Sequence, residues 1–270
     1  MRRRLDVELV RRGLAGSRTR AATMITAGRV LVAGIPARSP AHQVEPTDAI
    51  TLSGPGPRFV SRGGEKLDAA LRAFAVDVAG RRILDAGAST GGFTDCLLRH
   101  GAGHVYAVDV GRGQLAWSIR TDPRVTVLER TNIRQLERAA LGGPVPLAVA
   151  DLSFISLVTV APALARCTSA DADLVLLVKP QFEAGRERVG KGGVVRDPSV
   201  HAAVLVEVAA GLDSAGLPVV DATPSPVLGA DGNREFFVRC TKRAEPTTTA
   251  RLEQAAQVRP ANRARGIVVS

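Results

Sequence analysis

Apolar positions along the second part of the chain come in short runs that alternate with stretches of helical period. The runs of strand length are 82–86, 104–110, 125–129, 146–152 and 173–179. Amphipathic or apolar helical patterns precede and separate most of them, most clearly at 65–74 and 198–216. Continuous apolar strands that alternate with helices predict a mostly parallel sheet with helices on both faces.

The last two predicted strands, 219–227 and 234–240, are joined by a short segment that contains GADGN and no helix. A short connection favours antiparallel pairing, so we expect these two strands to form a hairpin at one edge of the sheet. The fold class predicted for this region is a Rossmann-like α/β fold with a seven-stranded, mostly parallel sheet.

The first fifty residues have a different pattern, typical of a small α+β domain. Helices are expected at 5–14 and at 17–30, the second with Ser17 as its N-cap, and strands at 30–37 and 48–52. The segment GPGPR that follows is rich in residues that break helices and strands. We therefore predict four parts, which are a domain at 1–54, a linker at 55–62, a domain at 63–243 and a loosely ordered polar tail at 244–270.

Positive charge is concentrated in the small domain. The whole chain has a formal net charge of +10, with 36 lysines and arginines against 26 acidic residues. Before residue 30 the arginines are Arg2, Arg3, Arg4, Arg11, Arg12, Arg18, Arg20 and Arg29. Only Asp6 and Glu8 oppose them there. This clustering favours phosphate binding over a solvated helix face, which normally mixes both signs of charge.

Several functional classes are disfavoured. No apolar run is long enough to span a bilayer, and no secretory h-region follows the first arginines. Cys96, Cys167 and Cys240 are far apart, which argues against disulfides and zinc sites and suits the reducing cytoplasm. The histidines, at 42, 100, 104 and 201, have no ligand spacing, so no metal site is expected.

The segment ILDAGASTGGF (83–93) places glycines between a strand and a helix. Gly87 allows a tight turn, and Gly91 and Gly92 allow a ligand to approach the helix N-terminus. The spacing Gly-x-x-x-Gly-Gly differs from the dinucleotide fingerprint. Asp85 suits a cofactor with a positive group, and Asp109 after the next strand suits ribose hydroxyls. Together these residues favour a binding site for S-adenosylmethionine. The alternative is an ordinary strand-to-helix turn that binds no ligand.

The choice of reaction depends on the ends of later strands. ADLSF (150–154) lacks the Asn/Asp-Pro-Pro-aromatic sequence of enzymes that methylate exocyclic amines, and no cysteine has the neighbour expected for carbon-5 methylation. What remains is Asp151 and Lys179 at the carboxyl ends of apolar strands. A lysine amine there could accept a proton from an alcohol. The alternatives are a helix cap or turn residue for Asp151 and a solvated strand end for Lys179.

These motifs resemble those of the FtsJ-like ribose 2′-O-methyltransferases. The Lys-Asp-Lys-Glu tetrad of that family matches Lys66 in SRGGEKLDAAL, Asp151 in ADLSFIS, Lys179 in LVKPQFE and Glu235 in GNREFFV. The resemblance implies that Lys179 is the base and that the other three tetrad residues orient it. It implies a class I methyltransferase domain with S-adenosylmethionine as cofactor.

The whole chain, including RLDxxLVxxGLxxSRxxA at 4–21 and GxVxVxG at 28–34, resembles the TlyA (haemolysin A) family. In that family an alpha-L RNA-binding domain precedes the methyltransferase domain. The resemblance implies 2′-O-methylation of cytidine in ribosomal RNA, with ribosomal subunits as partners. We also expect a monomer, without stable membrane association.

The resemblance also extends the predicted sites. The predicted cofactor residues are Asp85, Gly87, Ser89, Gly91, Gly92, Phe93, Asp109, Asn132 and Asp151. The predicted RNA-binding residues are Arg4, Arg18, Arg20, Arg62, Arg130, Arg134 and Arg186. The segment PRFV (57–60) occupies the family's linker, where it could couple the RNA and cofactor sites.

Two positions depart from the family pattern. Ala33 replaces a common asparagine in a turn, and Arg112 replaces a common aromatic residue. The basic segment KGGVVRDP (191–198) is either an active-site loop or a surface turn. Two other functional classes are a non-catalytic RNA-binding or ribosome-assembly protein and a membrane-lytic protein. The intact tetrad opposes the first, and Glu207 and Gly211 within the long helix oppose the second.

Overall fold

The protein is described by a computed structural model that covers residues 2–54, 58–229, 232–242 and 246–257. The chain divides into two compact units, with the boundary between Arg58 and Phe59. That boundary lies inside the predicted linker, of which 55–57 fall outside the described residues. Phe59 is already buried in the second unit, and helix α3 of that unit begins at Arg62.

The first unit is a small α+β domain. Its helices are α1 (Leu5–Arg11) and α2 (Arg18–Thr26), and its strands are β1 (Arg3–Arg4), β2 (Val30–Val32), β3 (Ile35–Pro36), β4 (Gln43–Val44) and β5 (Ile50–Leu52). The sheet orders are β3-β2-β5 and β1-β4. Both helices were predicted, with longer ends, and the Ser17 hydroxyl caps α2 by accepting the Arg20 N–H. The strands β1 and β4 were missed because two-residue strands leave no periodic pattern.

The turn between β2 and β3 has left-handed backbone at both of its central residues, with φ of 49° at Ala33 and 81° at Gly34. This is the geometry in which asparagine or glycine is favoured, because a Cβ is strained there. Ala33 therefore occupies a backbone conformation that suits asparagine or glycine better.

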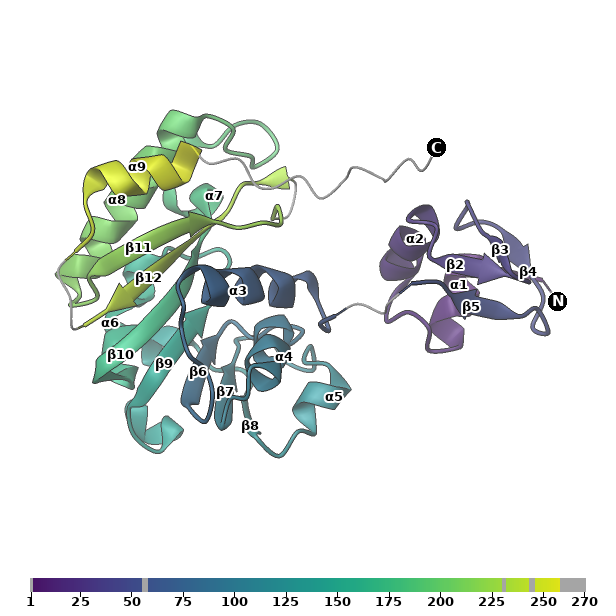
Figure 1. The fold of residues 1–270 in the computed structure, drawn as a ribbon, viewed down its shortest axis with the longest axis horizontal. Coiled ribbons are helices and arrows are strands. Elements are labelled where there is room, and N and C mark those ends of the chain that lie inside the picture. Colours follow the sequence, from purple (N-terminus) through teal and green to yellow (C-terminus); the bar gives the residue numbers. More distant parts are fainter. Residues whose placement is uncertain (1, 55–57, 230–231, 243–245, 258–270) are drawn as a thin grey trace. The chain divides into compact units, whose positions relative to one another are not determined.

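The second unit is a three-layer α/β domain (Figure 1). Its strands are β6 (Arg82–Ala86), β7 (His104–Val108), β8 (Val125–Leu128), β9 (Val145–Ala150), β10 (Thr168–Val178), β11 (Val219–Pro224) and β12 (Phe236–Thr241). Its α-helices are α3 (Arg62–Ala73), α4 (Gly92–Arg99), α5 (Trp117–Arg120), α6 (Leu157–Cys167), α7 (Pro180–Glu183), α8 (Pro198–Ser214) and α9 (Thr249–Gln257). Short 3₁₀ helices lie at Ile133–Gln135, Arg138–Leu141 and Arg186–Arg188.

The seven strands form one sheet in the order β11-β12-β10-β9-β6-β7-β8. Helices α3, α4 and α5 pack on one face and α6, α8 and α9 on the other, and each face has its own apolar cluster. The alternation of side chains along a strand explains this, since Ile83 belongs to one cluster and Leu84 to the other. The predicted Rossmann-like fold is confirmed, and so is the antiparallel hairpin of β11 and β12 at one edge.

The strand register decides where the functional side chains lie. The last residues of β6, β7 and β9 are adjacent, because Ala86 pairs with both Val108 and Ala150. Antiparallel β12 begins where β10 ends, since Phe236 pairs with Val178. The residues that follow the parallel strands and the residue that precedes β12 therefore meet at one edge of the sheet.

The prediction of a loosely ordered tail is wrong for residues 249–257. They form α9, with Leu252, Ala255 and Ala256 buried, and Leu252 and Ala256 join the apolar cluster that includes α8. The Thr247 N–H donates to the Val219 carbonyl at 2.6 Å and so ties the preceding segment to β11. The polar composition of this segment led to the wrong prediction, because its three buried apolar residues, Leu252, Ala255 and Ala256, lie on one helix face. Residues 258–270 of the predicted tail lie outside the described residues.

We expect the substitution Leu252→Ala to lower the free energy of unfolding by about 2–4 kcal/mol, because it removes a buried side chain that packs between α9 and the core. Urea unfolding followed by circular dichroism measures this. The control is Leu228→Ala at an exposed leucine, for which we expect a change within about 0.5 kcal/mol. Equal, small effects of both substitutions would mean that α9 does not dock.

Candidate active site

The turn between β6 and α4 requires glycine for reasons of space as well as backbone geometry. Gly87 has a φ of 87°, and a Cβ at this position would overlap the backbone carbonyl of Asp151. A Cβ on Gly92 would overlap the hydroxyl of Ser61. The glycines thus allow the turn, the end of β9 and the start of α3 to lie within contact distance of one another.

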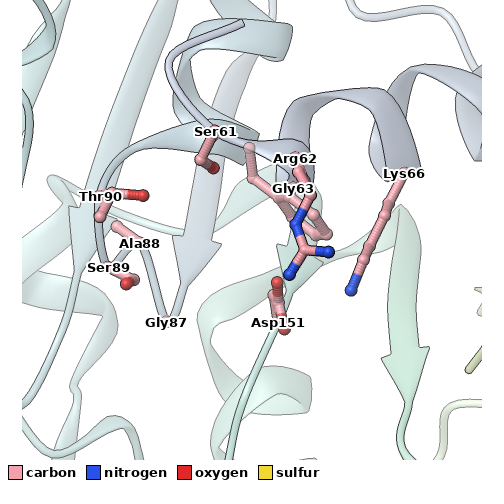
Figure 2. Close-up of a pocket in the computed structure, with 11 residues that line it drawn as sticks. Ser61, Arg62, Gly63, Lys66, Gly87, Ala88, Ser89, Thr90 and Asp151 are labelled. Atoms are coloured by element: carbon pink, nitrogen blue, oxygen red, sulfur yellow. The ribbon is translucent and has the colours of Figure 1, made fainter. Parts of the chain in front are cut away.

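A cavity of about 210 Å³ opens between this turn and α3 (Figure 2). Its lining residues are Ser61, Arg62, Gly63, Lys66, Gly87, Ala88, Ser89, Thr90, Gly92, Phe93 and Asp151. The structure therefore brings together Lys66, Asp151 and much of the predicted cofactor set. Ser61 and Gly63 were not predicted because they belong to α3 and its N-terminus, and nothing in the local sequence indicates that they face the glycine turn.

A second, small cavity adjoins the first, and both are lined by Ala88 and Ser89. Asp109 lines it, and its carboxylate accepts the Ser89 N–H at 2.8 Å and the Gly111 N–H at 2.7 Å. The residues there that the sequence did not indicate are Ala107, Gly111, Gln114, Leu115, Val127 and Glu129. The pairing of β7 with β8 brings Glu129 to this edge, which a motif search along one strand could not detect.

Three predicted cofactor residues do not line either cavity. Gly91 is the N-cap of α4, and a Cβ there would press on Leu115. Asn132 caps a 3₁₀ helix by accepting the Arg134 N–H at 3.1 Å. Asp85 lies beneath the glycine turn and is fully buried. Contact of these three residues with the cofactor stays a prediction.

Asp85 is the most perturbed acid of the site. Burial, together with the nearby carboxylates of Asp151 and Asp109, raises the pKa of Asp85 to about 7, although the hydrogen bond that Thr94 donates at 2.6 Å acts in the opposite direction. Its second oxygen, Oδ1, is buried without a hydrogen-bond partner. A cation nearby would stabilise the charged form of this carboxyl group.

The predicted tetrad forms two ion pairs. Lys179 Nζ lies 2.6 Å from Asp151 Oδ1 and donates a hydrogen bond to the Ser153 hydroxyl at 2.9 Å. Asp151 Oδ1 has no aligned hydrogen-bond partner, so it can still accept one from a further donor. Lys66 Nζ pairs with Glu235 Oε2, and both of these side chains are buried. Because Lys66 and Asp151 line the same cavity, both pairs lie at its wall.

Figure 2 shows the side chains of Arg62 and Lys66 extending from α3 towards Asp151. Arg62 was predicted from the sequence to bind RNA, and here it lines the first cavity. The cavity wall thus combines a carboxylate with two cationic groups. Such a wall can hold an anionic or hydroxyl-bearing substrate group while it leaves a carboxylate for a cationic one.

The residues fit S-adenosylmethionine. Two adjoining cavities share the glycine turn, and the Asp109 carboxylate can accept hydrogen bonds from two ribose hydroxyls. Asp85 Oδ1 is buried without a hydrogen-bond partner at the strand edge that also carries Asp151, where a sulfonium or ammonium group would compensate the charge of the Asp85 carboxylate. The absence of a Gly-x-Gly-x-x-Gly turn leaves no cradle for a pyrophosphate.

The arginines of the first unit are held by two buried carboxylates. Asp6 pairs with Arg4 and Arg18. Glu8 pairs with Arg3, Arg11 and Arg12, and hydrogen bonds from Arg11 and Arg12 lower the pKa of Glu8 to about 2. Two negative charges thus organise five guanidinium groups and leave an excess of positive charge on this unit.

The other predicted RNA-binding residues lie in the second unit. Arg130 has left-handed backbone with a φ of 53°, Arg134 follows Asn132 in the 3₁₀ helix, and Arg186 begins another 3₁₀ helix. The structure does not bring these three side chains into the cavities. Their role in RNA binding stays a prediction.

One group of possible metal ligands occurs among the described residues, away from both cavities. It consists of Asp68 on α3 with Cys96 and His100 on or next to α4. Asp68 already pairs with Arg72 and lies 2.9 Å from His100 Nε2. Through the contact with His100, the Asp68 carboxylate links α3 to the end of α4. Also within the described residues, no helix is long and apolar enough to cross a membrane.

Comparison with known proteins identifies both parts of the chain. A profile of FtsJ-like methyltransferases matches residues 59–242, and a profile of the S4 domain matches residues 3–50. The 16S/23S rRNA (cytidine-2'-O)-methyltransferase TlyA of Mycobacterium tuberculosis is 56% identical over 94% of this chain and 96% of its own length. The chain belongs to the TlyA family of FtsJ-like methyltransferases.

Other TlyA relatives carry different names. Hemolysin A of Brachyspira hyodysenteriae is 41% identical over 87% of this chain and 98% of its own length. A solved structure from Streptococcus thermophilus, provisionally named as a hemolysin, superposes with a TM-score of 0.76 at 39% identity and covers 94% of both chains. The resemblance inferred from the sequence motifs is therefore confirmed.

We expect Asp85→Asn to gain stability relative to the wild type as the pH rises from 5 to 8. The folded protein holds the Asp85 proton up to about pH 7. The unfolded chain releases it near the ordinary pKa of about 4, so ionisation costs the folded wild type on the order of a few kcal/mol that asparagine avoids. Urea unfolding of the cofactor-free protein at both pH values measures the difference. The control is Asp77→Asn, at an exposed aspartate. If the stability difference between Asp85→Asn and the wild type did not change with pH, the raised pKa of Asp85 would be contradicted.

Proposed function

We propose that this TlyA-family protein transfers the methyl group of S-adenosylmethionine to the ribose 2′-hydroxyl of cytidine in ribosomal RNA, in the cytoplasm. The observation that carries the proposal is the Lys179–Asp151 pair at the edge of the cavity, with Lys66 and Glu235 paired beside it. The name of the Mycobacterium tuberculosis relative supports it, as does that of the Campylobacter jejuni relative, a 23S rRNA (cytidine-2'-O)-methyltransferase TlyA that is 31% identical over 71% of this chain.

Lys179 is proposed to accept the proton of the attacking hydroxyl at Nζ. When bound, S-adenosylmethionine would supply an electrophilic methyl group. The hydroxyl oxygen would form an ether bond to that methyl carbon while the carbon–sulfur bond breaks, so that S-adenosylhomocysteine leaves and the hydroxyl proton passes to Nζ. The ammonium that forms when Nζ accepts this proton is stabilised by Asp151 Oδ1, which lies 2.6 Å from Nζ. The Ser153 hydroxyl, at 2.9 Å, fixes the direction of the lysine side chain. Proton acceptance and orientation are therefore performed by one compact group of side chains.

Lys66 and Arg62 are proposed to hold the substrate. Both come from α3 and line the cavity wall that faces Asp151. Glu235 pairs with Lys66 and keeps its ammonium group at that wall. Removal of Glu235 would leave Lys66 without its partner. Lys66 could then pair with Asp151 and compete with Lys179 for that carboxylate.

The first unit is proposed to select structured RNA. Its buried Asp6 and Glu8 fix the guanidinium groups, which retain donors for phosphate oxygens. Guanidinium groups that are already fixed in position lose less conformational freedom when they bind, so this arrangement favours a rigid phosphate pattern.

We expect Lys179→Ala to lower kcat for methyl transfer to ribosomal subunits by about 100-fold or more, because it removes the proton acceptor. Transfer of a labelled methyl group to purified subunits measures kcat, and calorimetry should show S-adenosylmethionine affinity within about threefold of the wild type. The matched control is Lys242→Ala, at a lysine whose Nζ donates to the carbonyls of Ala165 and Thr168 far from the cavity. Normal methyl transfer by Lys179→Ala would refute the proposed base.

The double substitution Arg18→Ala and Arg20→Ala should weaken RNA binding. It should also make the association constant less dependent on salt: the negative slope of log K against log salt concentration should become smaller in magnitude by about 2, one for each lost phosphate contact. Filter binding of ribosomal RNA between low and moderate salt concentrations measures the slope. Arg251→Ala is the control, because Arg251 lies on α9 and pairs with Asp221. An unchanged slope for the double variant would place the RNA contact elsewhere.

A further inference from the structure

Residues 190–196 form a short hairpin that is closed by the backbone. The Gly190 N–H donates to the Val194 carbonyl, and Gly192 and Gly193 turn the chain with φ of 78° and 73°. Val194 and Val195 are buried, whereas Lys191 and Arg196 are exposed. This is the segment for which the sequence left an active-site loop and a surface turn equally open.

A single buried side chain joins this hairpin to the segment that carries Glu235. Asn233 is 2% exposed, and its amide group bonds to the hairpin in both directions. Its Oδ1 accepts the Val195 N–H at 3.1 Å, and its Nδ2 donates to the Gly193 carbonyl at 3.0 Å. Two backbone groups of the hairpin are thus satisfied by the residue two positions before Glu235.

The backbone of Asn233 contributes a third link. Its carbonyl accepts the Gly229 N–H at 2.8 Å. Gly229 lies so close to the Glu235 carboxylate that a Cβ at this position would overlap Oε1. Asn233 therefore holds one wall of the space in which that carboxylate lies.

His201 strengthens the same connection from the other side. Its Nε2 is 3.0 Å from the Val195 carbonyl, and its ring packs at a tilt on Phe236, with the centroids 5.4 Å apart. Phe236 follows Glu235 directly at the start of β12. The hairpin is consequently linked to Asn233, two positions before Glu235, and through His201 to Phe236, directly after it.

We infer that Asn233 is a positioning residue for the proposed methyl transfer: it fixes Glu235, and through Glu235 the Lys66 ammonium, against the hairpin 190–196. Asn233 touches neither cavity and none of the proposed reacting atoms. The effect of Asn233 passes through a series of contacts. The hairpin bonds to Asn233, Asn233 bonds to Gly229, Gly229 lies against the Glu235 carboxylate, and that carboxylate pairs with Lys66. This inference rests on the proposed function for its kinetic readout and on the geometry alone for its structural readout.

The kinetic test is Asn233→Ala, assayed with ribosomal subunits and S-adenosylmethionine. We expect kcat to fall about tenfold or more through the displaced Lys66–Glu235 pair, while the affinity for S-adenosylmethionine stays within about twofold. Asn233→Asp keeps an acceptor for Val195 but loses the donor to Gly193, so its kcat should lie between those of the wild type and Asn233→Ala. Unchanged kcat in Asn233→Ala would overturn the inference, and so would a loss of cofactor affinity equal to the loss of kcat.

The control is Thr168→Val, which removes a buried hydrogen bond to the Leu164 carbonyl elsewhere in the same domain. It should lower stability without lowering kcat per folded molecule. An equal loss of kcat in this variant would mean that any weakened hydrogen bond has the same effect, and the inference would fail.

Two further measurements remain informative if Asn233→Ala folds poorly. Gly229→Ala leaves the Asn233 bonds in place but pushes on the Glu235 carboxylate, so it should reproduce the loss of kcat. Amide hydrogen exchange should show faster exchange at Val195 in Asn233→Asp or Asn233→Ala than in the wild type, without any substrate. Wild-type protein that methylates no ribosomal RNA would refute the proposed function, whereas active wild type with unimpaired Asn233 and Gly229 variants would refute this inference only.

Discussion

The register of one sheet is the constraint on which the site depends. Parallel strands β6, β7 and β9 end side by side, and antiparallel β12 starts beside the end of β10. This register places Gly87, Asp109, Asp151, Lys179 and Glu235, from five separate segments, along one edge. A shift of one residue in β9 or β10 would turn the side chains of that strand to the opposite face and separate Asp151 from Lys179, and a shift in β12 would displace Glu235 from Lys66. The apolar clusters on the two faces of the sheet fix that register.

Local sequence patterns predicted much of this arrangement. Apolar runs between helices indicated the parallel sheet, and the short GADGN connection indicated the antiparallel edge. Both features can be predicted from the sequence because each depends on residues that lie close together along the chain. The glycine turn and the strand-end charges Asp151 and Lys179 were likewise visible. The tetrad came from the resemblance to a family, because nothing local shows that Lys66 on α3 meets Glu235 at the other end of the domain.

Features that depend on contacts between distant segments were missed. Ser61 and Gly63 face the glycine turn only because α3 packs on α4, and Glu129 reaches Asp109 only through the pairing of β7 with β8. The sequence does not predict helix α9, because its few apolar residues form a buried face only where they pack against α8. In the small domain, counting charges indicated a basic surface but not that Asp6 and Glu8 are buried and organise five arginines.

The residues at the cavity edge are proposed to activate a ribose hydroxyl and not a base atom. The most direct measurement is to incubate the purified protein with ribosomal subunits and labelled S-adenosylmethionine, digest the RNA to nucleosides and identify the labelled product by mass spectrometry. We expect the label in 2′-O-methylcytidine. Label in a base-methylated nucleoside, or no label in either ribosomal subunit, would contradict it.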